Sequence, residues 1–441
     1  MADVFASVPR KDQRAKGDCY LRGLMLDGRR KSIQPMAERL PDGNEQNLQQ
    51  FVNQSTWDPV PVRRRIAQRM VPRIGPEAWA VDDVSFPKDG KMSVAVARQS
   101  CGALGKRANC QVAVSVHAVS DTASCPLQWR MFVPEEWADD AVRRQKTGIP
   151  QEVGHREKWR LALDILDELA GWGLVPPVVV ADAGYGQNAD FRDGLSERGI
   201  GYVVAVRSDV TVHPHDVRPT APAWSGNGRR PQPRYRDKPS SVAALAQEHG
   251  RQAFTEVTWR EGSRGPMHSR FLALRCGGRG EGPPSGPSRR HCRARHWDGV
   301  LPEVTLLVEW PQDAEAPTDY WLSNLPADTP ITELVRLSKI RWRIEHDYRE
   351  LKHGLGLDHF EGRSWNGWHH HVTLVTAHAF LTERLSPKPI QRTHPLPDPR
   401  RHPGPAELLD RHLHHLPPPA AQNIHHQPEP KSQSNLTEPY Y

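Results

Sequence analysis

The chain has 441 residues, enough for two or three domains with a substantial core. Hydrophobic residues make up only 37% and charged residues 25%, and 41 prolines and 33 glycines interrupt the chain, so we expect a folded centre with polar, irregular segments attached. The net charge of +7 is compatible with a polyanionic partner but does not prove one.

Several protein classes are excluded at this stage. No run approaches the ~20 consecutive apolar residues of a membrane span, and the N-terminal stretch MADVFASVPRKDQR lacks the apolar middle of a signal peptide. The six cysteines are scattered and form no CxxC pair, which indicates reduced thiols. We therefore expect a cytoplasmic protein with no membrane contact.

The first 75 residues are predicted to be helical, because Ile33–Leu40 and Leu48–Val52 carry short apolar periodicity around a Pro-Asp-Gly turn. This region holds 14 Lys and Arg against 8 Asp and Glu. With Arg63-Arg64-Arg65 nearby, two short helices around a tight turn favour a DNA-binding helix pair. A helical bundle with a solvated basic face explains the same pattern equally well.

From residue 79 the pattern changes to strands. Runs rich in β-branched residues predict strands at Trp79–Val84, Ser93–Arg98, Gln111–Val119 and Pro126–Val133. An apolar face predicts a helix at 155–172, followed by a buried strand at Pro177–Ala181, a helix at 188–198 and a strand at Gly201–Arg207. This order predicts a mixed α/β sheet of ribonuclease-H type with helices on both faces.

The remaining segments divide into three. Residues 208–330 interrupt the alternation of strands and helices and are predicted to form a β-rich insertion, with loops dense in Pro, Gly and Arg at 213–240 and 277–297. A helix at 331–355 resumes the core, which therefore comprises 76–207 and 331–385. The tail at 386–441 holds 13 of the 41 prolines and seven histidines with little apolar periodicity, which predicts disorder.

Three acidic positions are candidates for chemistry. Asp82, with Asp83 beside it, lies in an apolar strand, where a carboxylate is costly unless a cation or hydrogen-bond donors compensate it. Asp182 ends a buried strand, the place where open α/β sheets bind ligands. Glu345 lies in the helix SKIRWRIEHDYRELK. Taken singly, each has a simpler explanation: an exposed acid, a turn cap, and an internal Arg–Glu pair.

Two strand-borne aspartates and one helical glutamate together can bind divalent metal ions through oxygen ligands. Two such ions can activate a nucleophilic water or 3′-hydroxyl in an in-line phosphoryl transfer. Arg341 and Lys352 lie on the helix face of Glu345, with Arg349 adjacent, and are predicted to face phosphates.

Further basic residues follow the first acid, and a solvated basic edge explains any one of them as well as a phosphate contact does. They are Lys88, Lys91, Arg98, Lys106 and Arg107. Three consecutive histidines, His369-His370-His371, point in three directions on a helix, so packing or DNA contact is favoured over a shared metal.

Three segments taken together, residues 80–117, 178–209 and 340–371, resemble the bacterial insertion-sequence DDE transposases that carry a β-rich insertion. The resemblance covers residues 10 to about 385. It implies a ribonuclease-H-like core, catalytic acids at Asp82, Asp182 and Glu345, and Mg²⁺ as cofactor, with Mn²⁺ as a substitute. It also implies a helical N-terminal region that grips the transposon ends, and a homodimer in the synaptic complex.

The glutamate helix of that family carries a Tyr-Arg-Glu-Lys signature, which Arg341, Glu345 and Lys352 match in residue and spacing. The tyrosine position is Ser338, and Val84 stands where the family usually has threonine. Neither departure removes an expected metal ligand. The first acid is expected at Asp82 rather than Asp83, because the family pattern is Asp, a variable residue, then usually Thr.

The sequence thus predicts a transposase that cleaves double-stranded DNA at the inverted-repeat ends of its element and joins them to target DNA. Two alternatives stay open: a nuclease on the same fold without strand transfer, and a catalytically inactive or domesticated DNA-binding protein.

Overall fold

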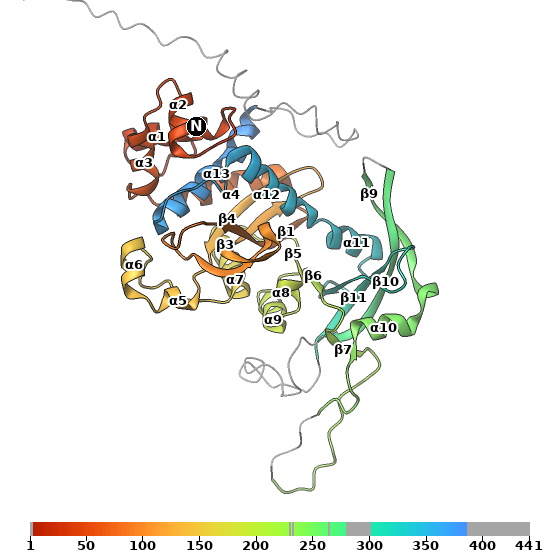
Figure 1. Cartoon of the computed structure of the whole chain (residues 1–441). Helices are drawn as coiled ribbons and strands as arrows, with labels where there is room; N and C mark the ends of the chain where they lie inside the picture. Colours follow the sequence, from red (N-terminus) through yellow and green to blue (C-terminus); the bar gives the residue numbers. More distant parts are fainter. Residues whose placement is uncertain (1–2, 229–230, 232, 263–264, 279–300, 386–441) are drawn as a thin grey trace, which may run out of the picture.

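The computed structural model describes residues 3–385 except 229–230, 232, 263–264 and 279–300 (Figure 1). The expected disorder of the 386–441 tail, and most of the expected 277–297 loop, lie outside the described residues. The N-terminal region is helical, as predicted. Its helices are α1 (Lys11–Met25), α2 (Ile33–Arg39), α3 (Glu45–Asn53) and α4 (Pro59–Ile74).

Helix α4 shows how local sequence sets a helix boundary. The Asp58 side chain accepts a hydrogen bond from the backbone N–H of Val60, and Pro59 occupies the first turn, where no N–H is required. The helix ends at Gly75, whose φ of 54° lies in the left-handed region that favours glycine. Both ends are therefore encoded within the segment itself.

The centre of the molecule is a mixed sheet. Its first strands pair in the order β2-β3-β1-β5-β6, with β4 paired to β3. Strands β1, β5 and β6 are parallel, whereas β3 is antiparallel to β1. The bounds are β1 (Ala78–Pro87), β2 (Ala97–Cys101), β3 (Lys106–Val119), β4 (Ser124–Met131), β5 (Val179–Ala181) and β6 (Tyr202–Val206). The second strand begins four residues later than the predicted Ser93–Arg98.

Helices cover both faces of this sheet, as predicted for a ribonuclease-H-like fold. On one face, α7 and α9 pack against Trp79 and Val81 of β1. On the other, α11 and α12 pack with Ala78 and Ala80 of the same strand. Alternate side chains of β1 therefore enter different cores. The bounds are α5 (Glu135–Ala138), α6 (Ala141–Thr147), α7 (Lys158–Gly171), α8 (Ala183–Gly186), α9 (Ala189–Glu197), α11 (Ile331–Lys339) and α12 (Trp342–Leu355).

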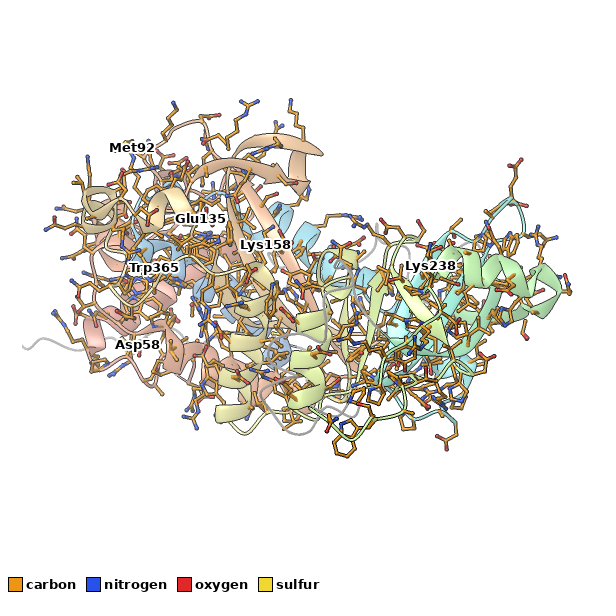
Figure 2. All side chains as sticks on the ribbon, turned by 90° about the horizontal axis from the view of Figure 1, so that it is seen from below. Asp58, Met92, Glu135, Lys158, Lys238 and Trp365 are labelled. Atoms are coloured by element: carbon orange, nitrogen blue, oxygen red, sulfur yellow. The ribbon has the colours of Figure 1, made fainter. Side chains whose placement is uncertain are left out.

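The segment between β6 and α11 is rich in strands, and these strands extend the central sheet. Strand β12 pairs with β6 and continues through β11 and β10, so twelve described strands form one sheet. A short helix, α10, was not predicted. The bounds are β7 (Thr211–Pro214), β8 (Ser240–Ser241), α10 (Val242–His249), β9 (Thr255–Gly262), β10 (Gly265–Gly278), β11 (Glu303–Trp310) and β12 (Asp319–Ser323). Figure 2 shows this part, with Lys238, beside the half that carries Lys158.

The single helix predicted at 331–355 is divided in two. Helix α11 ends at Lys339, α12 begins at Trp342, and Arg341 lies at the junction. The reason is the sheet beneath: α11 packs on β6, β9 and β10, whereas α12 packs on β1, β3 and β4. Because a twisted sheet turns its surface from strand to strand, a helix that follows it has to bend.

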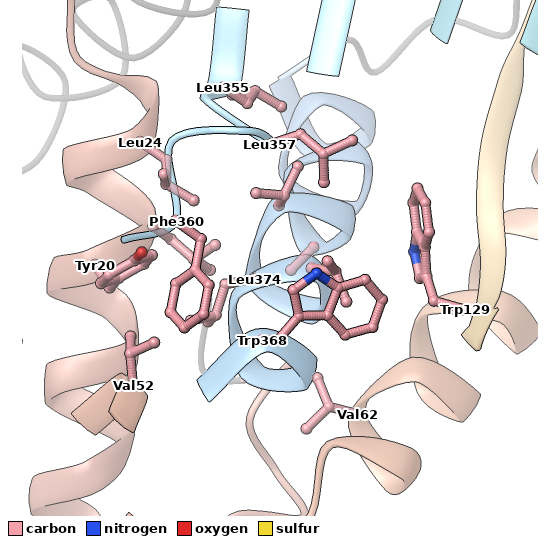
Figure 3. Close-up of a cluster of buried hydrophobic side chains, with 14 of the residues drawn as sticks. Tyr20, Leu24, Val52, Val62, Trp129, Leu355, Leu357, Phe360, Trp368 and Leu374 are labelled. Atoms are coloured by element: carbon pink, nitrogen blue, oxygen red, sulfur yellow. The ribbon is translucent and has the colours of Figure 1, made fainter. Parts of the chain in front are cut away.

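The last described helix, α13 (Trp365–Leu385), returns to the N-terminal helices. Figure 3 shows Tyr20 of α1 and Trp368 of α13 in the shared apolar core, with Phe360 between the helices. His369, His370 and His371 are buried there, which agrees with a packing role. His370, for example, stacks on Trp57 at 4.0 Å between ring centroids.

Candidate carboxylate site

The register of the parallel strands brings two of the predicted acids together. Val81 of β1 pairs with Ala181 of β5, so Asp82 and Asp182 are the next residues on neighbouring strands. Val81 and Ala181 belong to the core on the α7 face, and successive side chains of a strand point to opposite faces, so Asp82 and Asp182 both lie on the α12 face of the sheet. Helix α12, which carries Glu345, covers that face.

Arg341 connects the strand acid to the helix acid. Its Nη1 donates to Oδ2 of Asp82 at 2.8 Å, and its Nη2 donates to Oε1 of Glu345 at 2.7 Å. The side chain of Asp82 is buried, whereas that of Glu345 is 58% exposed. The residue predicted to face phosphates thus bridges two of the predicted metal ligands.

Asp182 has the capping role that its position also suggested. Its Oδ1 accepts hydrogen bonds from the backbone N–H groups of Gly184 at 2.9 Å and Tyr185 at 3.3 Å, which opens the short helix α8. Burial raises the pKa of this carboxyl group. A capping role leaves metal binding possible, since a carboxylate has about four lone-pair sites.

Asp82 is the most strongly perturbed acid of the site. Burial raises its pKa to about 7, and the charges of Asp182 and Asp83 act in the same direction. The Arg341 guanidinium favours the ionised form, but burial outweighs it. A carboxyl group whose pKa is raised to about 7 is typical of a functional site or of a site that requires a cation.

Asp83 belongs to the opposite face of β1. Its Oδ2 accepts from Nζ of Lys158, the first residue of α7, at 2.6 Å. Lys158 was not predicted as a site residue, although it lies in the first turn of the helix predicted at 155–172. Tyr185 was also missed; its hydroxyl is buried and has no hydrogen-bond partner among the described residues, and it lies in the field of Asp82, Asp83 and Asp182.

The residues present fit a divalent cation, although they are not assembled around one. Four carboxyl groups, on Asp82, Asp83, Asp182 and Glu345, lie near two cations, Arg341 and Lys158, so the acids outnumber the bases. The ligands are all oxygen atoms, as Mg²⁺ and Mn²⁺ prefer. In the described part of the chain, no three Asp, Glu, His or Cys side chains lie close enough together to hold one ion.

The four basic candidates fall into two pairs. Lys352 donates from Nζ to the carbonyl oxygen of Ser85 at 3.1 Å, and Lys88 donates to that of Phe360 at 2.6 Å. Burial lowers the pKa of both lysines. Arg98 and Arg349 are exposed. The two lysines therefore stand near the end of β1 with further N–H donors available, while the two arginines reach solvent.

The N-terminal arginines separate in the same way. Arg63 is buried and donates to the side chains of Thr373 and Gln128 and to the carbonyl oxygen of His369. Arg64 and Arg65 are exposed. Of the three consecutive arginines, only these two are accessible to a partner.

Comparison with known proteins agrees with these features. The sequence profile of a family described as DDE superfamily endonuclease matches residues 3–266, well over half of the chain. This range includes Asp82 and Asp182 and ends before Glu345. The probable transposase for insertion sequence element IS701 from Microchaete diplosiphon is 28% identical over 191 residues, or 42% of this chain and 47% of that protein. The match thus spans about half the length of this relative. None of the described helices is both long and apolar enough to cross a membrane.

Proposed function

Because the chain belongs to the DDE superfamily endonucleases, we propose that it is the transposase of an insertion sequence, which cleaves DNA at the inverted-repeat ends and joins them to target DNA. The observation that carries the proposal is that Asp82 and Asp182 follow paired residues of neighbouring parallel strands on the sheet face that α12 covers, and that Arg341 joins Asp82 to Glu345 of that helix. The family match and the similarity to a probable transposase support it.

In this proposal Asp82, Asp182 and Glu345 hold Mg²⁺, for which Mn²⁺ substitutes. When bound, the metal supplies Lewis acidity and an activated water or 3′-hydroxyl for phosphoryl transfer. The chain's own contribution is to hold two carboxylates on the ends of rigid strands and to exclude water from Asp82. The raised pKa of Asp82 supports the assignment, since a nearby cation favours its ionised form.

Arg341 has two roles in the proposal. Without metal it holds Asp82 and Glu345 together through its two Nη atoms. With metal and DNA bound, it releases these carboxylates and turns its planar guanidinium to a phosphate, which it can contact through two parallel N–H groups. Its place at the junction between α11 and α12, outside both helices, supports such a movement.

Asp82, rather than Asp83, is proposed as the first ligand. Asp83 points to the α7 face, where Lys158 already neutralises it. Asp82 points to the face that Asp182 and Glu345 share. Asp83 and Lys158 then serve to position β1 against α7.

DNA contacts are proposed for Arg98, Arg349, Lys88 and Lys352, together with the N-terminal helices. Lysine and arginine contacts to phosphates raise affinity without selecting sequence, and each contact makes binding more sensitive to salt. Two protomers on two ends are proposed for the synaptic complex. Residues 1–75 are proposed to grip the ends, with Arg64 and Arg65 rather than the buried Arg63 accessible to DNA.

The test uses the purified full chain and labelled duplex DNA carrying the sequences that flank its gene, in Mg²⁺ or Mn²⁺. Wild type is compared with Asp82→Asn, Asp83→Asn and Glu345→Gln. Asp82→Asn and Glu345→Gln are expected to abolish cleavage, at least a 10²-fold loss, whereas Asp83→Asn retains it within about tenfold. Equal loss in the two adjacent asparagine variants contradicts the assignment of Asp82.

The products distinguish the alternatives. Cleaved ends joined to a second DNA support a transposase, and cleaved ends without joining indicate a nuclease. Binding without cleavage by wild type identifies a DNA-binding protein. Ser338 stands in the tyrosine position of the signature, and its hydroxyl donates to the backbone carbonyl oxygen of Val335 in the same helix at 2.8 Å. This departure from the family signature is the feature that favours the last outcome.

A further inference from the structure

A buried chain of hydrogen bonds lies beneath the carboxylate site. His117 of β3 contacts Oδ2 of Asp347 of α12 through Nδ1 at 2.7 Å, and Oγ of Ser115 through Nε2 at 3.0 Å. Ser115 Oγ in turn lies 2.7 Å from the hydroxyl of Tyr348. Ser124 of β4 also donates to Asp347. These side chains join three elements, β3, β4 and α12, under the residues proposed to bind metal.

The directions of these hydrogen bonds follow from the chemistry of the groups. An ionised carboxylate only accepts, so His117 donates from Nδ1 to Asp347. In the neutral ring Nε2 then accepts from Ser115, and the Ser115 oxygen accepts from Tyr348. Every member thus has a partner of the correct type.

This hydrogen-bond network resembles the serine–histidine–aspartate arrangement of hydrolases, but Ser115 is not placed to act as a nucleophile. Ser115 and His117 are both 0% exposed, and the hydroxyl of Tyr348 is hydrogen-bonded to Ser115 Oγ. A substrate carbonyl or phosphate cannot reach Ser115 Oγ. The hydrogen-bond network therefore has a structural role within the protein and does not act on a substrate.

Its position connects it to the site. Ser115 is the register partner of Asp82 across β3 and β1. Asp347 and Tyr348 lie two and three residues after Glu345, and burial together with the nearby charge of Asp82 raises the pKa of the Tyr348 hydroxyl. Asp82 is therefore adjacent to the network through its strand partner Ser115, and Glu345 is adjacent to it through Asp347 on the same helix.

The hydrogen-bond network also fixes the position of α12 along the sheet. Apolar contacts by Ile344, Leu351 and Leu355 hold the helix on the sheet, but such contacts tolerate sliding. A slip of one turn, about 5.4 Å, leaves the buried Asp347 without donors and His117 without a partner, which is strongly unfavourable. Buried polar pairs of this kind specify register where apolar packing does not.

We propose that the Ser115–His117–Asp347 hydrogen-bond network is a positioning device that sets α12 on the sheet, so that Glu345 lies on the same sheet face as Asp82 and Asp182. The inference rests on the proposed function for its metal readout, but its effect on α12 is a property of the protein alone. These residues act through Glu345 and do not touch the metal.

The experiment compares wild type with Asp347→Ala, Asp347→Asn, Ser115→Ala and the control Thr376→Val. Asparagine keeps the shape of Asp347 and one of its two acceptor oxygens, which is enough to accept from His117. Thr376 is a control for disturbed packing beside the network: its buried hydroxyl accepts from Nε1 of Trp129 at 2.9 Å, and the Trp129 ring contacts those of His117 and Tyr348. Thr376 itself lies on α13 and donates to the carbonyl oxygen of Val372, so its loss breaks no hydrogen bond of the network. Three quantities are measured: the Mn²⁺ dissociation constant by calorimetry, backbone amide exchange of α12, and the unfolding midpoint.

We expect Asp347→Ala to weaken Mn²⁺ binding about 10- to 100-fold and to speed amide exchange in α12, as loss of groups that orient metal ligands does. Asp347→Asn is expected to recover most of the affinity, and Thr376→Val to lower the midpoint without changing either quantity. Ser115→Ala provides the milder test if Asp347→Ala does not fold, with a smaller change in the same direction.

The inference would be overturned if Asp347→Ala and Ser115→Ala both kept the wild-type Mn²⁺ affinity and the wild-type amide exchange of α12. If wild type binds no Mn²⁺, the proposed metal site fails, and amide exchange alone decides the positioning role. Faster exchange in Asp347→Ala but not in Thr376→Val supports that role, and equal exchange refutes it.

Discussion

Acid is expected to unfold this protein through the buried histidines of α13, and His371 provides the clearest case. Its ring is 1% exposed and stacks against Phe360 at 5.3 Å between centroids. Nδ1 accepts from the Tyr20 hydroxyl at 3.0 Å, so the proton lies on Nε2, which faces the carbonyl oxygen of Gly356 at 3.1 Å. Burial lowers the pKa of His371 to about 4.

The lowered pKa translates into a loss of stability on the acid side. The unfolded chain takes up the proton near pH 6.5, whereas the folded protein resists it until about pH 4. The contribution of His371 is therefore fully present above pH 6.5 and is lost as the pH falls toward 4. The expected loss is about 2 kcal/mol by pH 5 and about 3 kcal/mol in total.

Urea unfolding between about pH 7.5 and pH 5 measures this loss for wild type, His371→Gln and His353→Gln. Glutamine does not titrate, so His371→Gln is expected to lose about 2 kcal/mol less than wild type over this interval, whatever its stability at neutral pH. His353, an exposed histidine at the end of α12, provides the control and should follow wild type. A His371→Gln curve parallel to wild type within about 0.5 kcal/mol refutes the reasoning.

Two further pairs of variants test the packing around the site. Arg63→Ala is expected to lose roughly 3 kcal/mol in urea unfolding, because it opens a cavity and removes the hydrogen bonds that join α4, β4 and α13, whereas the exposed Arg64→Ala changes stability by less than about 0.5 kcal/mol. Similar losses in both contradict this. A Cβ at Gly186 would lie 2.1 Å from the carbonyl oxygen of Ala205, so Gly186→Ala should lower the melting temperature by several degrees, since ~1 kcal/mol corresponds to a few degrees. Gly171→Ala, in a helix with open space around it, should leave the melting temperature equal or higher, and a loss there would argue against the packing described.

Much of the fold was predictable from local pattern. The apolar run before Asp182 and the alternation around Asp82 predicted the buried strands β5 and β1, because burial imposes a period of two or a continuous apolar run on a strand. The apolar face of α7 was equally clear. These signals are complete within about ten residues, so no tertiary contact is needed to detect them.

Other features depended on contacts between distant segments. The pairing of β12 with β6, the bend at Arg341, and the contact of His117 with Asp347, 230 residues away, each arise from the arrangement of segments that carry no local mark of one another. Arg63 illustrates the same point, since it stands beside two arginines of identical chemistry and only it is buried.

The candidate carboxylates follow from the sequence alone, because an acid in an apolar strand requires compensation. That Asp82 faces α12 with Arg341, and Asp83 faces α7 with Lys158, is visible only in the folded protein. Adjacent residues of a strand point to opposite faces, but which face meets which helix depends on chain connections that no short segment encodes.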